Sequence, residues 1–220
     1  MEMLSAVISI VIIDLVLAGD NAVVIALAAK GLPDKQRNKA IYIGTAGAIL
    51  LRVLLTAVAV WLLSIPYLQA IGGLILIPVA YKLLKQDDSH ETNIDAANSM
   101  ITAIKTIIVA DAAMSFDNVL AVAGASKGHF PLVVFGLLIS IPIVVYCSKF
   151  ISTMMDKYPI LITFGTAILC WTAGSMIVHD RILGVFITSL GIPFINMIVP
   201  TTIIILVLGL NYYKNCSKKK

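Results

Sequence analysis

Seven long apolar stretches run through this 220-residue sequence and restrict what it can fold into. Each is long enough, at about 20 residues, for a helix to cross the hydrocarbon core of a bilayer. Lipid cannot hydrogen-bond backbone amides, and continuous apolarity lacks the alternation of a barrel strand, so these stretches are expected to be transmembrane helices. The expected spans are residues 5–29, 40–63, 66–85, 102–125, 131–153, 158–178 and 184–210.

The composition supports a membrane protein. Hydrophobic residues make up 60% of the chain and charged residues 13%, against roughly 45–50% and about 25% in soluble domains. The predicted fold class is therefore an all-α membrane protein. Lys and Arg gather in loops on one side of the spans, so the positive-inside rule predicts a multi-pass cell-membrane protein with its N-terminus outside and its C-terminus in the cytoplasm.

Two short acidic motifs lie inside apolar spans. Each consists of Asp, five further residues, and then Asp-Asn: Asp14, Asp20 and Asn21 in the first copy, and Asp111, Asp117 and Asn118 in the second. An ionisable group at the centre of a bilayer costs about 2.5–3.5 kcal/mol on insertion scales, so acids there mark a functional site. We expect these residues to be the ligands of a transported cation.

The duplication covers whole helices. A shift of 97 residues superposes the two motifs and also places Arg52 on Lys149, and a shift of 93 aligns the third span of each half. Each half then has three spans, and because three is odd, the second half must enter the membrane in the opposite sense, as in the inverted repeats of secondary transporters. Such repeats place their substrate site near the bilayer midplane. The predicted organisation is a first three-helix repeat at 1–85, an acidic cytoplasmic linker at 86–101, a second three-helix repeat at 102–178, a seventh transmembrane helix at 179–210 and a basic cytoplasmic tail at 211–220.

The ligand chemistry of the motifs favours hard cations. Carboxylate and amide oxygens suit Mg²⁺, Ca²⁺ and Mn²⁺, whereas Zn²⁺ and Cu⁺ sites usually recruit His or Cys. Neither motif contains His. Met114, inside the second motif, is either a soft contact that favours Mn²⁺ or an ordinary packing residue. The residues alone thus predict a transporter of hard divalent cations, with the metal and the direction of transport open.

Helix geometry separates the two acids of each motif. Six residues of an ideal helix rise by about 9 Å and turn the chain by roughly 120°, so Asp14 and Asp20 cannot hold one ion from an intact helix. With inverted repeats, Asp14 and Asp117 are expected toward the outer side of the midplane, and Asp20 and Asp111 toward the inner side. Gly19 is a place where the first helix can be distorted, and the second motif has no glycine there.

A structural role for some of the acids is the main alternative for the site. Asp14 or Asp111 can form an interhelical ion pair with Arg52 or Lys149 instead of binding a transported ion. These basic groups can also balance the acids when the site is empty, which limits repulsion between carboxylates.

Other functions fit the sequence less well. An intramembrane aspartyl protease would use two Asp residues that share a proton, but Leu17-Ala18-Gly19-Asp20 matches a Gly-x-Gly-Asp signature only loosely, so no enzyme activity is expected. A non-transporting membrane factor that assists insertion or metalation of exported proteins would need larger partner surfaces than these short loops. No phosphate-binding Gly-x4-Gly-Lys-Ser/Thr sequence occurs, so export would use an ion gradient, preferably by proton antiport. Beyond the divalent ion and the lipid bilayer, no permanently bound cofactor and no nucleic acid are expected, and protein partners are open.

The paired motifs and the seven-span layout resemble the TerC family of integral membrane proteins, in its short YjbE/YkoY-type bacterial branch. The resemblance covers nearly the whole chain. It implies efflux of Mn²⁺ from the cytoplasm, with the motif acids and amides lining the ion path. Carried over to this sequence, it makes Asp20, Asn21, Asp117 and Asn118 the foremost ligand candidates, and Asp14 and Asp111 either ligands or proton-coupled groups.

Overall fold

The structure, a computed structural model, describes residues 19–58, 65–85, 96–125, 130–189, 191–192 and 194–218, with all their side chains except those of 96–98, 116–130, 132–133 and 215–218. Every regular element in these ranges is a helix. The helices are Gly19–Ala29, α2 (Asp34–Ala57), α4 (Leu68–Lys85), α5 (Ala96–Ala125), α6 (Phe130–Lys157), α7 (Ile160–His179), α8 (Leu183–Ser189) and α9 (Ile195–Lys218).

Two of the helices begin before the apolar stretch that predicts them. α2 begins at Asp34 rather than at residue 40, and α5 begins at Ala96 rather than at residue 102. Backbone hydrogen bonds continue through polar residues, so hydropathy locates the membrane-embedded part of a helix rather than its ends. α5 continues unbroken to Ala125, so the second acidic motif lies in an intact helix, whereas Asp14 of the first lies outside the described residues.

The last predicted span differs from the structure. Instead of one helix over 184–210, a short α8 ends at Ser189 and α9 begins at Ile195. Between them, Gly191 has a φ of 66° and Phe194 a φ of 60°. Such left-handed backbone does not continue a right-handed helix, and glycine adopts it without steric cost. Because the residues of this connection are mostly apolar, hydropathy alone did not predict that the helix breaks here.

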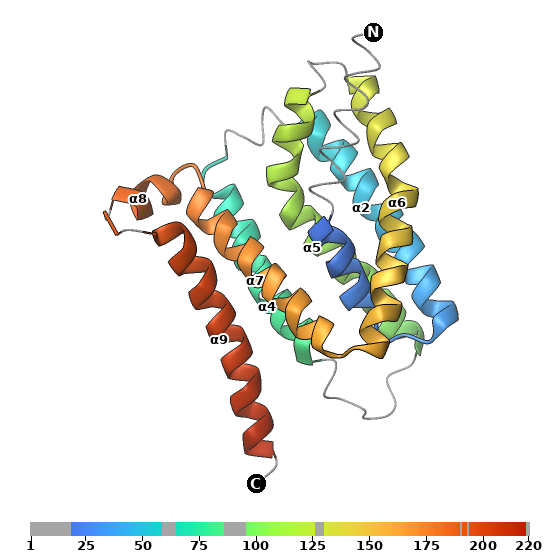
Figure 1. The fold of residues 1–220 in the computed structure, drawn as a ribbon. Coiled ribbons are helices and arrows are strands. Elements are labelled where there is room, and N and C mark those ends of the chain that lie inside the picture. Colours follow the sequence, from blue (N-terminus) through green and yellow to red (C-terminus); the bar gives the residue numbers. More distant parts are fainter. Residues whose placement is uncertain are drawn as a thin grey trace.

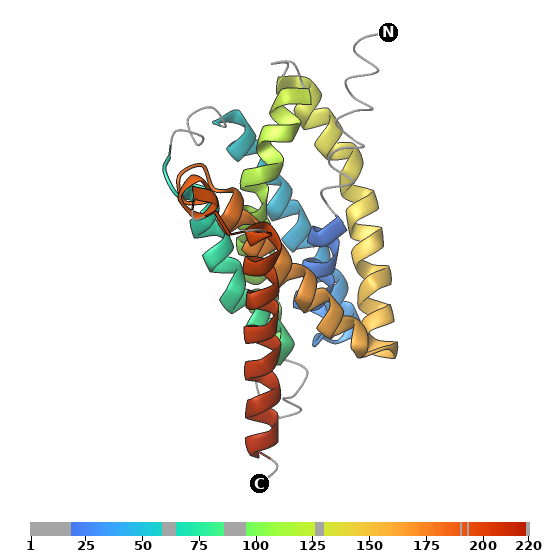
Figure 2. The same ribbon diagram turned by 60° about the vertical axis from the view of Figure 1, so that its left-hand side comes forward.

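The helices pack as two neighbouring groups. α2 packs against α5 and α6, α4 packs against α7, and α4 and α5 join the groups (Figure 1). Figure 2 shows α9 along the outside, where it contacts α7 and α4. The start of α2 and the ends of α4, α6 and α9 lie at the same end of the bundle in Figure 1. The basic residues near these helix ends are Lys35, Arg37, Lys39, Lys82, Lys85, Lys157 and Lys214.

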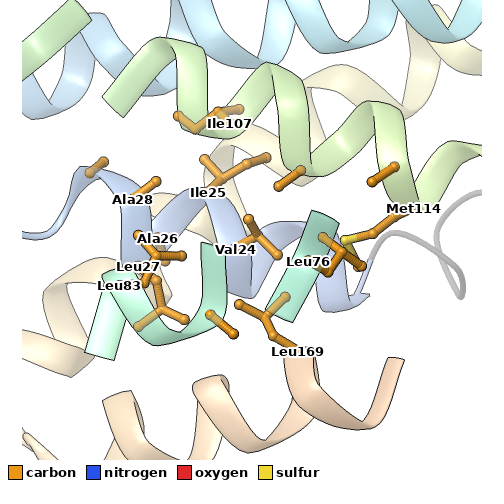
Figure 3. Close-up of a cluster of buried hydrophobic side chains, with 14 of the residues drawn as sticks. Val24, Ile25, Ala26, Leu27, Ala28, Leu76, Leu83, Ile107, Met114 and Leu169 are labelled. Carbon is orange, nitrogen blue, oxygen red and sulfur yellow. The ribbon is translucent and has the colours of Figure 1, made fainter. Parts of the chain in front are cut away.

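The core surrounds the helix Gly19–Ala29. Figure 3 shows Val24 and Ile25 between α5 and α4, with Leu169 of α7 on the far side. Met114 of α5 belongs to the same apolar cluster and lies near Leu76 of α4. Its role as a packing residue, one of the two alternatives from the sequence, is therefore confirmed. The helix that carries Asp20 and Asn21 thus packs against several neighbouring helices.

The close contacts of α7 with α4 and α9 depend on glycine. A Cβ atom added at Gly73 of α4 would lie 2.5 Å from the carbonyl oxygen of Ala173 in α7. A Cβ atom added at Gly174 of α7 would lie 2.5 Å from Cα of Pro200 in α9. Small residues let backbones approach closely where lipid supplies no hydrophobic driving force for association.

The helices suit a membrane. Five of those described are long and apolar enough to cross a bilayer, namely α2, the part of α6 from Val134 to Lys157, α7, α4 and the part of α9 from Ile195 to Lys214. Many large apolar side chains, such as Leu50 and Phe164, face outward. These features fit an all-α, multi-pass membrane protein. Seven spans and an inverted repeat stay predictions, because residues 1–18, 59–64 and 86–95 lie outside the described part.

Asp180, just after α7, joins three helix ends. Its Oδ1 accepts hydrogen bonds from the backbone N–H groups of Ile182 and Leu183 at 3.0 and 2.9 Å, and its Oδ2 accepts one from Ala70 at 3.2 Å. Burial raises the pKa of Asp180, but these backbone hydrogen bonds outweigh it and hold the pKa below the usual value. Asp180 is therefore a structural acid that caps the first turns of α8 and α4.

Candidate functional site

A small cavity lies at mid-length between the long helices. Thr45 is the twelfth of the 24 residues of α2, Asp111 the sixteenth of the 30 of α5, and Val144 the fifteenth of the 28 of α6. The cavity has a volume of ≈ 10 Å³, close to the 10–15 Å³ that one water molecule needs. Its lining residues are Asn21, Ile25, Thr45, Ala48, Ile49, Arg52, Asp111, Ser140 and Val144.

A buried ion pair forms one wall of the cavity. Nη2 of Arg52 donates to Oδ1 of Asp111 at 2.6 Å, and the side chains are 4% and 7% exposed. Ser115, one turn further along α5, completes the network: its Oγ accepts from Nε of Arg52 and donates to Oδ2 of Asp111, both at 3.1 Å. Both carboxylate oxygens of Asp111 are thus engaged. Of the pairings that the sequence left open, the structure contains the one between Asp111 and Arg52.

Two other polar side chains on the cavity wall have no hydrogen-bond partner among the described residues. They are Asn21, whose amide oxygen and nitrogen are both unpaired, and Thr45, whose hydroxyl is unpaired. Asn21 is 2% exposed and Thr45 1%. Because buried polar atoms are nearly always hydrogen-bonded, unpaired donors and acceptors around a cavity indicate space for a ligand, a water or an ion.

Asp20 adds a second carboxylate to this region. It is partly buried, and its Oδ1 accepts the backbone N–H of Asn21 at 2.9 Å. The structure therefore brings Asn21 of the first motif together with Asp111 of the second at one cavity, and Asp20 is the chain neighbour of Asn21. Asp14 lies outside the described residues, and Asp117 and Asn118 lie on α5 with side chains that are not described.

Sequence reasoning missed three polar residues of the site. Thr45 and Ser140 line the cavity from α2 and α6, and Ser115 supports the ion pair from within the second motif. Ser115 lies inside the second motif, between Asp111 and Asp117, so its position in the sequence could have indicated it. Thr45 and Ser140 carried no signal, because Ser and Thr are common in membrane helices, where they bond to carbonyls of their own helix, as Ser140 does to Leu137.

A second, wider hollow of ≈ 430 Å³ lies between the start of α2 and the end of α6. It is lined by Asp34, Arg37, Asn38, Lys149, Thr153 and Asp156. Nη1 of Arg37 lies 2.6 Å from Oδ2 of Asp156, in a pair that is 15% and 40% exposed. Lys149 occupies the position in the second half that corresponds to Arg52 in the sequence repeat. Its Nζ lies over the ring of Tyr42, 3.9 Å from the centroid. The two halves thus use their corresponding basic residues differently.

The side chains that line the cavity offer oxygen atoms as ligands, and none of these lining residues is a His, Cys, Met or aromatic residue. No group of three or more His, Cys, Asp or Glu side chains gathers among the residues that the structure describes. The oxygen donors that line the cavity are one carboxylate, one amide and two hydroxyls, from Asp111, Asn21, Thr45 and Ser140, and such oxygens suit hard cations. The volume admits one water or one ion stripped of most of its water, so coordination there would be largely by protein oxygens.

Comparison with known proteins finds relatives that match this chain over most or all of its length. The model of the TerC family of integral membrane proteins matches residues 1–219. The chain is 45% identical over 220 residues to the uncharacterized membrane protein YjbE of Bacillus subtilis, with 99% of each chain covered. It is 26% identical over 178 residues to YkoY of the same organism, covering 71% of this chain and 54% of YkoY. A UPF0053 protein of Haemophilus influenzae is 24% identical, with 80% and 81% covered.

No solved structure matches the chain. The family match extends over both acidic motifs and all the described helices, and the similarity to YjbE runs from end to end. The chain therefore belongs to the TerC family of integral membrane proteins.

Proposed function

We propose that this protein transports divalent cations across the cell membrane, and that Mn²⁺ leaving the cytoplasm is its main cargo. The observation that carries the proposal is the buried cavity lined by Asn21 and Asp111, one from each acidic motif, and by Thr45, whose hydroxyl has no hydrogen-bond partner among the described residues. The unpaired atoms are those of Asn21 and Thr45, and a bound polar ligand would supply them with a partner, which supports the proposal.

The donor set supports a hard divalent ion. Asp111, Asn21 and Thr45, which carry oxygen donors, line the cavity, and Asp20 precedes Asn21 in the same helix. Such oxygens suit Mn²⁺, Mg²⁺ and Ca²⁺, and Mg²⁺ gives up its water most reluctantly. The choice of Mn²⁺ and of efflux rests on the resemblance that the sequence motifs carry.

We also propose that the chain has seven spans arranged as 3+3 inverted repeats plus a C-terminal helix. Two features support this. The helix Gly19–Ala29 and α2 line the cavity from the first half, and α5 and α6 line it from the second. The cavity also lies at mid-length of α2, α5 and α6, as a site at the bilayer midplane would. The basic helix ends in Figure 1 would face the cytoplasm, with the N-terminus outside.

Mn²⁺ flux in proteoliposomes tests the proposal. Wild-type protein is compared with Asp20→Asn, which keeps the shape of the side chain and removes one charge, and with Ca²⁺ and Mg²⁺ as competitors. Flux should fall about tenfold or more in Asp20→Asn, because a negative charge next to Asn21 is lost from a region of low dielectric constant.

The matched control is Asp34→Asn, since the Asp34 side chain is 91% exposed at the start of α2. It should leave the flux unchanged. Wild-type protein that moves none of the three metals would contradict the proposal and would favour a membrane factor that assists insertion or metalation of exported proteins.

A further inference from the structure

The position of Arg52 suggests a part in transport beyond that of a structural partner. Its guanidinium donates a hydrogen bond directly to Oδ1 of Asp111. It also donates to Oγ of Ser115, which in turn donates to Oδ2 of the same carboxylate. Asp111 lines the cavity, so the oxygens that a cation would use are already occupied by a cation of the protein itself. Arg52 lines the same cavity.

Building on the proposed function, we propose that Arg52 is a resident cation that pairs with Asp111 in the empty transporter and gives up this carboxylate when a divalent ion loads. Two cations cannot share the carboxylate cheaply in a cavity of ≈ 10 Å³, because like charges repel strongly where the dielectric constant is low. Loading of the ion therefore requires withdrawal of the guanidinium.

Pairing with Arg52 keeps the Asp111 carboxylate from being buried without a partner when the transporter is empty. A transporter must return without its cargo, and an unpaired buried carboxylate is strongly destabilising. With Arg52 in place, Asp111 stays paired in the empty state, and its side chain is only 7% exposed. The same competition weakens ion binding, so that the cargo can be released. Arg52 is thus a positioning residue for the empty state rather than a ligand.

The exchange predicts that net transport and ion exchange respond differently to Arg52→Gln. Net Mn²⁺ flux needs the empty carrier to return, whereas exchange of labelled for unlabelled Mn²⁺ across the vesicle membrane does not. Net flux should fall about tenfold or more, exchange should stay within about twofold of wild type, and the half-saturating Mn²⁺ concentration should fall several-fold.

Two further variants complete the test. Arg52→Lys keeps a charge and should restore a substantial part of the net flux, and because it leaves Asp111 a cationic partner, it remains informative if Arg52→Gln does not fold. Arg37→Gln is the control, because Arg37 lies on the same helix but pairs with Asp156 near the surface. It should leave the half-saturating Mn²⁺ concentration unchanged.

Each outcome bears on a different claim. If Arg52→Gln lowers net flux and exchange together, or leaves the half-saturating concentration unchanged while wild type transports Mn²⁺, Arg52 is only structural and this inference is wrong, although the proposed function stands. If Arg52→Lys restores no more net flux than Arg52→Gln, the charge is not what matters and the inference is also wrong. If wild type shows neither net flux nor exchange, the proposed function fails and takes the inference with it.

Discussion

Two Arg–Asp pairs of equal length but different burial give a quantitative test of the structure. Arg52 and Asp111 lie 2.6 Å apart with side chains 4% and 7% exposed, and Arg37 and Asp156 lie 2.6 Å apart with side chains 15% and 40% exposed. Two unit charges whose centres are about 4 Å apart attract by about 4 kcal/mol at an effective dielectric constant of 20, and by about 1 kcal/mol in water. Burial should therefore dominate the difference between the pairs.

The perturbation is a double-mutant cycle on each pair, with Asp→Asn and Arg→Gln singly and together. Either single change at the Arg52–Asp111 pair leaves one buried charge without its partner, which should cost about 3–5 kcal/mol of unfolding free energy. The double variant should cost much less than the sum, so the coupling energy should be several kcal/mol. At the Arg37–Asp156 pair the coupling should be about 0–1 kcal/mol.

The assay is reversible unfolding of the purified protein in mild detergent without added divalent ions, followed by intrinsic Trp fluorescence or by cysteine accessibility. Coupling energies of equal size at the two pairs would refute the reasoning, since they would show that the Arg52–Asp111 pair is not shielded from solvent as the structure describes. A gain in stability for Asp111→Asn alone would refute it more strongly.

Three further predictions address other parts of the molecule. Thr45→Val removes an unpaired buried hydroxyl without changing the shape of the side chain, so stability should be kept while Mn²⁺ affinity, measured by calorimetry, falls several-fold; unchanged affinity would remove Thr45 from the site. Gly73→Ala should destabilise the protein by about 1–3 kcal/mol because of the contact with Ala173, whereas Gly209→Ala, with open space around it, should be neutral or stabilising; equal thermal shifts would contradict the packing. Because the pKa of Asp180 is lowered in the folded protein, its stabilising effect is complete above the unfolded value near pH 4 and is lost as the pH falls further, so Asp180→Asn should be less stable than wild type at neutral pH and should show a smaller loss of stability on acidification; parallel pH profiles would contradict this.

The sequence indicated the helices well because lipid leaves the backbone few alternatives. It predicted less about where they end. α2 and α5 begin six residues before their apolar stretches, because helices continue into the polar region. The break between α8 and α9 was missed because the residues around Gly191 are as apolar as a span, and only their backbone conformation distinguishes them.

The site was partly predictable for a similar reason. Acids within apolar stretches are rare enough to be conspicuous, so the sequence indicated Asn21 and Asp111, which line the cavity, and Arg52 as a partner for an acid; metal binding by these residues stays a prediction. Thr45 could not be found in this way, because its role depends on facing the same cavity as Asn21, and contact between helices is not encoded in the spacing along either one. The different positions of Arg52 and Lys149 were hidden too, since a repeat in sequence does not require symmetric contacts.

The most direct test of the central claim is to locate the metal. An experimental structure of the protein with Mn²⁺, with the ion identified by its anomalous scattering, would show whether the cavity between the helix Gly19–Ala29, α2, α5 and α6 is the cation site. We expect one Mn²⁺ ion there, with oxygens of Asp111 and Asn21 roughly 2.0–2.6 Å away and Arg52 withdrawn from the carboxylate. A cavity without Mn²⁺ under conditions in which the protein transports it, or an ion bound elsewhere while Arg52 and Asp111 remain paired, would contradict the account.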